Sequence, residues 1–178
     1  MKSNIALIGF MGVGKTAVAQ ALAEKLGCEF VELDLLIKKK AGKSIVEIFQ
    51  QDDEITFREL EIEVTRHAAQ KSNAVIACGG GIVLNQINID RLRINSRIVY
   101  LTASPSAILK RIARGGERRP LLEVPDPEAT VRELLKLRRP LYERAADITI
   151  DTTRINIGTA VEQIIARLKQ DEGFDLRK

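Results

Sequence analysis

Three glycines, a lysine and a threonine stand at fixed spacing near the start of the sequence, in the run GFMGVGKT from Gly9 to Thr16. The run satisfies the pattern G-x-x-x-x-G-K-[ST], in which backbone N–H groups turn toward phosphate oxygens. The lysine of such a loop reaches the β- and γ-phosphates, and the hydroxyl ligates Mg²⁺. The sequence therefore predicts a site for ATP and Mg²⁺, with nucleotide contacts from Gly12, Val13, Gly14, Lys15, Thr16 and Ala17.

The same run has a purely structural alternative, a glycine-rich turn that joins a strand to a helix. The complete motif between an apolar run and a helical pattern favours phosphate binding over that alternative. It does not separate transfer from hydrolysis or switching, because the loop occurs in kinases, GTPases and motor ATPases alike. The reaction has to be inferred from residues elsewhere in the chain.

A carboxylate and a glycine triplet follow two later apolar runs. Asp34 stands just after the second run, where it could orient a nucleophilic hydroxyl and accept its proton. Alternatively, Asp34 caps a helix that starts near Leu35. Gly79, Gly80 and Gly81 follow the third run and would let a substrate touch the backbone directly. A tight strand-to-helix turn explains one or two of these glycines, but three in a row less well.

These residues need a scaffold, and the apolar runs supply one. Runs bounded by turn residues predict five strands, which are Asn4–Phe10, Glu29–Leu33, Ala74–Cys78, Arg97–Leu101 and Asp147–Ile150. Helical patterns separate them, which indicates an α/β fold with a parallel sheet covered by helices on both faces. Ligands of such sheets bind beyond the carboxyl ends of the strands. Helix starts are predicted at Ser44, which forms a capping box with Glu47, at Ser104 and at Asp126.

Composition limits the class of protein. With 178 residues and 45% hydrophobic content, we expect one domain over residues 1–178, and a monomer. No run is long enough for a membrane helix, and Cys28 and Cys78 have no metal-ligand spacing, so we expect a cytoplasmic protein. The net charge of +4 is concentrated between residues 110 and 144. Tyr142 is the only aromatic there, which favours anionic small molecules over nucleic acid.

Two segments are expected to be loosely structured. The run RGGERRPLLEVPDP, residues 114–127, combines glycine, proline and basic residues and predicts a mobile lid over residues 112–126. The last eight residues, DEGFDLRK, are mostly polar and charged, and we expect them to be loosely held.

The order and spacing of these motifs resemble the shikimate kinase family over residues 4–168. The resemblance rests on GFMGVGKT, on Glu32 and Asp34, on GKSIVEIFQQDDEITFRELE, on the glycine triplet, on the lid arginines and on RRPLYERAADITIDT. It implies a five-stranded parallel sheet ordered 2-3-1-4-5, with a lid and a substrate-binding segment over residues 33–61. It also implies ATP, Mg²⁺ and shikimate as partners, with phosphorylation of the shikimate 3-hydroxyl on the route to chorismate and the aromatic amino acids.

The resemblance assigns roles residue by residue. Asp34 and the glycine triplet match the groups that hold the acceptor hydroxyls, and Arg58 and Arg138 match the arginines that hold its carboxylate. Arg58 could instead form a surface pair with Glu61, and Arg138 could lie on a solvated helix face. The choice of Arg138 over Arg139 rests on its offset from Pro140.

The nucleotide side is matched less completely. Arg119 matches the lid arginine that approaches the γ-phosphate, and Arg111 or Arg114 would lie against adenine. Asp151 and Thr152 resemble the start of the adenine loop. Where the family has an aspartate pair, this chain has Glu32 and Asp34, which makes Glu32 a metal candidate beside Thr16, with a longer arm.

Other functions remain open at this stage. A gluconate kinase or nucleoside-monophosphate kinase of the same fold is the enzymatic alternative, against which Arg58, Arg138 and the glycine triplet count. A nucleotide-sensing protein that has lost transfer is the non-enzymatic one, and Glu32 keeps it open.

Overall fold

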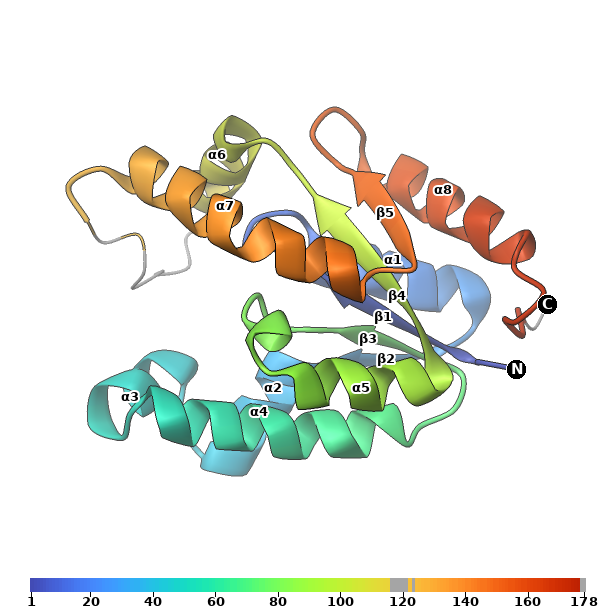
Figure 1. The fold of residues 1–178 in the computed structure, drawn as a ribbon, viewed down its shortest axis with the longest axis horizontal. Helices are drawn as coiled ribbons and strands as arrows, with labels where there is room; N and C mark the ends of the chain where they lie inside the picture. The colour runs from blue at the N-terminus through green and yellow to red at the C-terminus, as the bar shows by residue number, and fades with distance from the viewer. Residues whose placement is uncertain (116–121, 123, 177–178) are drawn as a thin grey trace.

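The computed structural model describes residues 1–115, 122 and 124–176. Its centre is a five-stranded sheet in the order β2-β3-β1-β4-β5, with every pair of neighbouring strands parallel (Figure 1). The strands are β1 (Asn4–Ile8), β2 (Glu29–Glu32), β3 (Ala74–Ala77), β4 (Ser96–Thr102) and β5 (Ile148–Asp151). The α/β class predicted from the apolar runs and the strand order implied by the family resemblance are both confirmed.

The central strands read as short continuous apolar runs because both of their faces are buried. All residues of β1 and β3 are buried, and Ala6 of β1 pairs with Ile76 on one side and Ile98 on the other. The five predicted strands all exist, and their ends differ from the prediction by at most two residues. The ends differ because apolar residues such as Phe10 and Leu33 stay buried after the strand has stopped.

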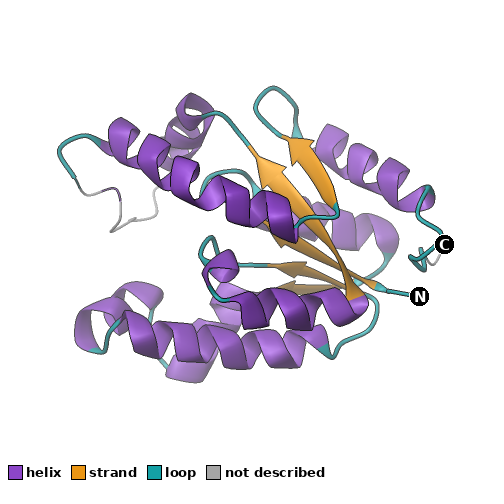
Figure 2. Ribbon diagram, in the orientation of Figure 1, coloured by secondary structure: helices purple, strands orange, loops and turns teal. Residues whose placement is uncertain are grey.

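Helices cover both faces of the sheet (Figure 2). On one face, α1 (Lys15–Leu26) packs beside α8 (Ile157–Lys169), and on the other α5 (Gln86–Asn95) and α7 (Pro127–Ala145) contact β4. The remaining helices are α2 (Leu33–Ala41), α3 (Ile45–Gln51), α4 (Glu54–Ala69), α6 (Pro105–Gly115) and the short η1 (Ile82–Leu84). Helices α2, α3 and α4 contact one another and form a group that corresponds to the predicted substrate segment.

The predicted helix starts are confirmed by their hydrogen bonds. The Ser44 hydroxyl accepts from the Glu47 amide at 3.2 Å, and the Ser44 amide donates to the Glu47 carboxylate at 2.7 Å. Ser104 and Asp126 accept from the amides three residues later, at 3.2 and 3.0 Å. Helix α6 continues through Gly115, so the first four residues of the predicted lid, 112–115, are helical. Residues 116–121 and 123 of the lid lie outside the described part of the chain.

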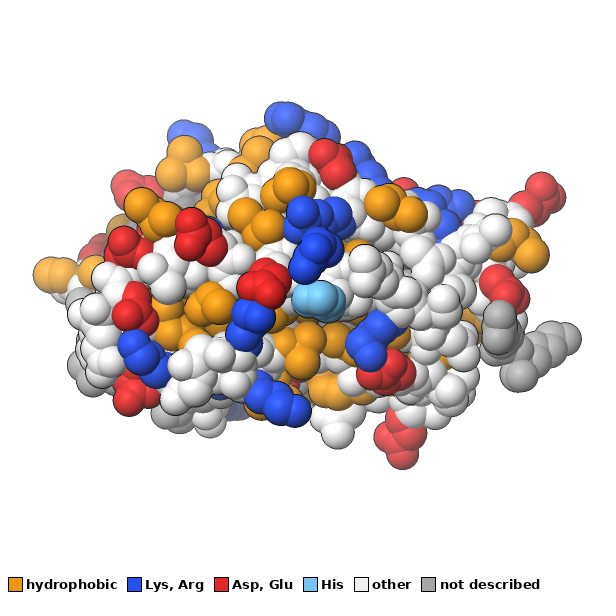
Figure 3. All heavy atoms as spheres, turned by 90° about the horizontal axis from the view of Figure 1, so that it is seen from below, with side chains coloured by type: hydrophobic (Ala, Val, Ile, Leu, Met, Phe, Trp, Pro, Cys, Tyr) orange, Lys and Arg blue, Asp and Glu red, His pale blue; other side chains and the backbone are white. Residues whose placement is uncertain are grey.

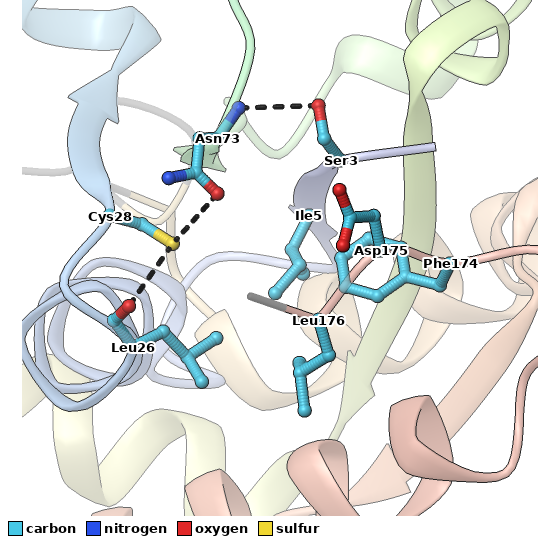
Figure 4. A pocket seen from close by; sticks show the side chains of 8 residues that line it. All are labelled: Ser3, Ile5, Leu26, Cys28, Asn73, Phe174, Asp175 and Leu176. Atoms are coloured by element: carbon cyan, nitrogen blue, oxygen red, sulfur yellow. Dashed lines mark hydrogen bonds between the residues drawn. The ribbon is translucent and has the colours of Figure 1, made fainter. Parts of the chain in front are cut away.

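The expectation of a loosely held C-terminal tail is wrong for residues 171–176. The Lys2 amide donates to the Gly173 carbonyl at 2.9 Å, and the Asp175 amide donates to the Lys2 carbonyl at 2.8 Å. Phe174 is buried with the core, and Asp171 forms an ion pair with Arg97 of β4. Figure 4 shows Phe174 and Leu176 lining a small pocket with residues of β1 and the loop after α1. The apolar side chains of an otherwise polar tail therefore fix it at the amino ends of the strands.

Charges of both signs are interspersed on the face drawn in Figure 3, where the single histidine lies among basic and acidic side chains. His67 is exposed and lies 3.5 Å from an Arg66 guanidinium nitrogen. Within the described residues, no helix has the length and apolar character that crossing a bilayer requires. Both cysteines are unpaired thiols, and burial raises the pKa of each.

Candidate active site

The phosphate loop connects the end of β1 to the start of α1. Gly14, the residue before the helix, has a φ of 98°, a conformation that glycine adopts without strain. The first turn of α1 contains no acidic residue, so no carboxylate of the helix itself offsets the positive end of the helix dipole at the loop. The Lys15 ammonium donates to the carbonyls of Gly9 and Phe10 at 2.8 and 2.9 Å. The lysine thus curls over the loop where phosphates would lie.

A second loop is attached to this one through Arg111 of α6. The Arg111 guanidinium donates to the Thr152 hydroxyl at 3.0 Å and to the Val13 carbonyl at 3.3 Å. The buried Thr152 hydroxyl also donates to the Val13 carbonyl, at 2.9 Å. The segment after β5, expected to form the adenine loop, therefore lies against the phosphate loop. Arg111 as an ATP contact stays a prediction, while Arg114 is exposed.

The two predicted metal ligands meet at the start of α1. The Thr16 hydroxyl donates to a Glu32 carboxylate oxygen at 2.9 Å, although 16 residues separate them. No cluster of three or more acidic, histidine or cysteine ligands occurs among the described residues. The Thr16 hydroxyl and the Glu32 carboxylate fit Mg²⁺, which keeps several waters and takes one or two protein oxygens beside nucleotide phosphates. The extra methylene of Glu32 does not prevent its carboxylate from reaching Thr16.

Asp34 lies in the first turn of α2, one residue after the helix begins at Leu33. The alternative of an N-cap for a helix near Leu35 is therefore wrong, because Glu32 occupies the cap position. Asp34 faces the glycine triplet: a β-carbon on Gly79 would lie 3.0 Å from an Asp34 carboxylate oxygen. The absence of a side chain at Gly79 thus leaves room around the candidate base.

Arg58 is held by two carboxylates of its own helix, α4. Its guanidinium lies 3.0 Å from Glu61 and 3.1 Å from Glu54. The pair with Glu61 exists, but it is no surface pair, since the Glu61 side chain is 1% exposed. Burial raises the pKa of Glu61, and the Arg58 guanidinium partly offsets that rise. A β-carbon on Gly81 would overlap the Arg58 guanidinium, so the triplet makes space for it.

Arg138 and Arg139 differ clearly in their surroundings. Arg139 is exposed and pairs with Glu143 one turn along α7, at 2.7 Å. Arg138 is half-buried, and its guanidinium carbon lies 5.9 Å from the centroid of the Phe10 ring in the phosphate loop. Arg139, and not Arg138, therefore lies on the solvated face of the helix. Arg138, the arginine predicted from its offset from Pro140, faces inward.

The positions of two residues in this region were not predicted from the sequence. Glu61 was considered only as a surface partner of Arg58, and its burial could not be read from an i, i+3 spacing. Tyr142 was noted only as an aromatic in a basic segment, yet it is fully buried and its hydroxyl donates to the Gly80 carbonyl. Its place four residues after Arg138, on one helix face, was the available signal.

The acceptor residues and the phosphate loop share one region of the molecule. A β-carbon on Gly80 would lie 3.5 Å from the Met11 amide nitrogen, so the triplet touches the phosphate loop. Asp34 and Arg138 both lie near enough to Glu61 to influence its pKa, in opposite directions. The structure thus brings Lys15, Asp34, Arg58, Arg138 and the triplet together at the carboxyl ends of the strands. Arg119 lies outside the described residues.

A parallel sheet in this order, with a complete phosphate loop and the predicted acceptor arginines beside it, is typical of a P-loop kinase. The family model for shikimate kinases matches residues 11–169. The chain belongs to the shikimate kinase family.

Relatives support this assignment over nearly the whole chain. A shikimate kinase from Caldanaerobacter subterraneus subsp. tengcongensis is 46% identical, covering 91% of this chain and 94% of that protein. One from Symbiobacterium thermophilum is 42% identical over 94% of this chain and 97% of the relative. The structure of shikimate kinase from Acinetobacter baumannii in complex with shikimate has a TM-score of 0.91, 36% identity, and coverage of 97% and 96% of the two chains.

Proposed function

We propose that this chain transfers the γ-phosphoryl group of ATP to the 3-hydroxyl of shikimate, using the residues of the shared region in the roles below. Family membership gives it shikimate kinase activity, a phosphotransferase step in aromatic amino acid biosynthesis. The observation that carries the site assignment is the convergence of Asp34, Arg58 and Arg138 beside the phosphate loop.

The nucleotide is held by the loop and the start of α1. Backbone amides from Gly12 to Ala17 surround the phosphates, and Lys15 moves from the carbonyls of Gly9 and Phe10 to the phosphate oxygens. Arg111 and the loop after β5 border the base. Arg119 approaches the γ-phosphate from the lid, as the family resemblance implies. Thr16 and Glu32 would hold Mg²⁺, Glu32 directly or through water, and the bound ion would supply positive charge beside the phosphates.

The acceptor is held at the other end of the same region. Arg58 and Arg138 fix its carboxylate, since two planar guanidinium groups suit that anion. The glycine triplet lets the ring approach the backbone, and Asp34 orients the reacting hydroxyl. The hydroxyl oxygen bonds to the γ-phosphorus, the bond from that phosphorus to the ADP oxygen breaks, and the hydroxyl proton passes to Asp34. ADP and the phosphate ester leave.

A coupled ADP-release assay with shikimate, gluconate and CMP as separate acceptors tests this proposal. We expect Mg²⁺-dependent ADP formation with shikimate alone, and a product whose ³¹P signal couples to the proton on carbon 3. ADP formation with gluconate or CMP instead would identify a different metabolite kinase. ADP formation with none of them would favour a nucleotide sensor.

A further inference from the structure

Tyr142 occupies a rigid position between α7 and the sheet. Its side chain is fully buried, and its ring stacks on that of Tyr100 in β4, with centroids 5.0 Å apart and 15° between the planes. Two rigid rings in contact restrict where the phenol oxygen can lie. The position of the Tyr142 hydroxyl is therefore set by the sheet.

That hydroxyl donates to the carbonyl of Gly80, the middle residue of the triplet. Burial raises the pKa of Tyr142, so the phenol stays protonated and remains a donor. The Gly80 carbonyl and the Gly81 amide belong to one planar trans peptide unit and point in opposite directions. A bond that fixes the carbonyl toward Tyr142 consequently fixes the Gly81 amide on the opposite side.

Tyr142 also lies beside Arg138, one turn earlier on the same face of α7. The Arg138 guanidinium offsets part of the effect of burial on the Tyr142 pKa, which requires the two groups to be close. Pro140 lies between them and has no amide to donate to the Lys136 carbonyl, so α7 is weakened at this turn. An anchor at Tyr142 limits the movement that such a turn would allow Arg138.

We infer that Tyr142 is a positioning residue for the acceptor, which holds the glycine triplet and Arg138 in the arrangement that binds the acceptor's carboxylate and hydroxyls. The inference rests on the proposed function, because it concerns that same acceptor. Tyr142 contacts the two acceptor-binding elements, which are separated in sequence by more than fifty residues, and links them through one side chain.

The test is Tyr142→Phe, which keeps the ring and removes the hydroxyl. An unsatisfied Gly80 carbonyl and a freer Arg138 should raise the KM for shikimate about tenfold, with the KM for ATP changed less than about twofold. The matched control is Tyr100→Phe, the same change in the stacked partner, which should leave both KM values unchanged. An unchanged KM for shikimate in Y142F, or equal rises for both substrates, would overturn the inference.

A second measurement uses the intact protein, in case Y142F does not fold. The chain has two tyrosines, so labelling with tyrosine carrying ¹³C at Cζ gives two signals, which Y100F assigns. Shikimate should shift the Tyr142 signal, and ADP alone should not. A Tyr142 signal that does not shift when shikimate is added would refute its role as a positioning residue. If the wild-type protein forms no ADP with shikimate, the proposed function is wrong. If the wild-type protein is active and Y142F has the same KM for shikimate, only the role of Tyr142 is wrong.

Discussion

Replacing Asp34 should slow the transfer step without weakening ATP binding. Asp34 faces Gly79 of the glycine triplet, and it belongs to a different element from the phosphate loop. Asp34→Asn should lower kcat about a hundredfold to ten-thousandfold, since it removes the proton acceptor. The Kd for ATP, measured by calorimetry, should stay within about twofold. Unchanged turnover would remove Asp34 from the catalytic role.

Arg138 and its neighbour Arg139 offer a matched pair of variants. Arg138→Ala should raise the KM for shikimate about tenfold to a hundredfold, because a carboxylate loses a charged hydrogen-bond partner. Arg139→Ala removes the same kind of side chain from the exposed face, where its pair with Glu143 contributes little. Steady-state kinetics on both variants provide the comparison. Similar KM values for R138A and wild type would move the acceptor carboxylate elsewhere.

Glu32 stands where the family resemblance implies an aspartate. Its carboxylate reaches Thr16 through one additional methylene, so Glu32→Asp should change the Mg²⁺ concentration for half-maximal activity several-fold. The control is Glu29→Asp, the same shortening on the same strand, at an exposed residue paired with Lys71. Magnesium titrations that coincide for E32D and wild type would argue against a role in metal binding.

At the scale of elements, the C-terminal segment differs from the prediction. Its composition, like that of the lid, predicted a loosely structured segment. Residues 171–176 are polar enough to suggest a free tail, yet Phe174 and Leu176 add apolar area to the core and Asp171 joins Arg97. An isolated apolar residue in a polar run gives no periodic signal, and its partner surface is formed by residues distant in sequence. The prediction failed for that reason.

The Asp171 pair predicts a pH dependence of stability. Hydrogen bonding from Arg97 lowers the pKa of Asp171 below its ordinary value of 3.8. Its stabilising contribution is therefore complete above pH 3.8 and is lost as the pH falls through the lower pKa of the folded state. Asp171→Asn should reduce the free energy of unfolding by about 1 kcal/mol at pH 7.

Urea denaturation of wild type and D171N at several pH values measures this difference. We expect the same difference in unfolding free energy between wild type and D171N at pH 7 and pH 5. The difference should become smaller only below the ordinary aspartate pKa. The control is Glu162→Gln, which breaks the exposed pair with Lys25 and should cost less than about 0.5 kcal/mol. A gap that already closes between pH 7 and pH 5 would contradict the assignment to Asp171.

At the scale of the whole molecule, the sheet brings the phosphate loop and the proposed acceptor residues together. Strands β1, β2 and β3 are adjacent and parallel, so the loops that follow them emerge at one edge, although more than sixty residues separate the first from the last. The Phe10 ring under Arg138 and the Gly80 backbone beside Met11 join the acceptor region to the phosphate loop. The phosphate loop and the proposed acceptor residues are therefore held by the same part of the sheet.

The sequence by itself determined the features that depend on local patterns. GFMGVGKT encodes the turn that follows β1 and the start of α1, and Ser44, Ser104 and Asp126 cap helices through bonds to amides three residues away. Apolar runs determined the five strands, because burial on both faces of a parallel sheet requires them. The offset from Pro140 pointed to Arg138 through the family resemblance; Arg138 is half-buried and Arg139 exposed because one residue of helix turns a side chain by about 100°.

Tertiary structure alone decided which side chains of distant segments meet. The burial of Glu61 of α4 beside Gly79, the bond from Tyr142 to Gly80 and the contact of Thr16 with Glu32 each depend on where two elements are placed relative to each other. The same holds for the C-terminal segment, whose partners are Lys2 and Arg97. Local periodicity carries no information about these pairings, since they are selected by the packing of the whole chain.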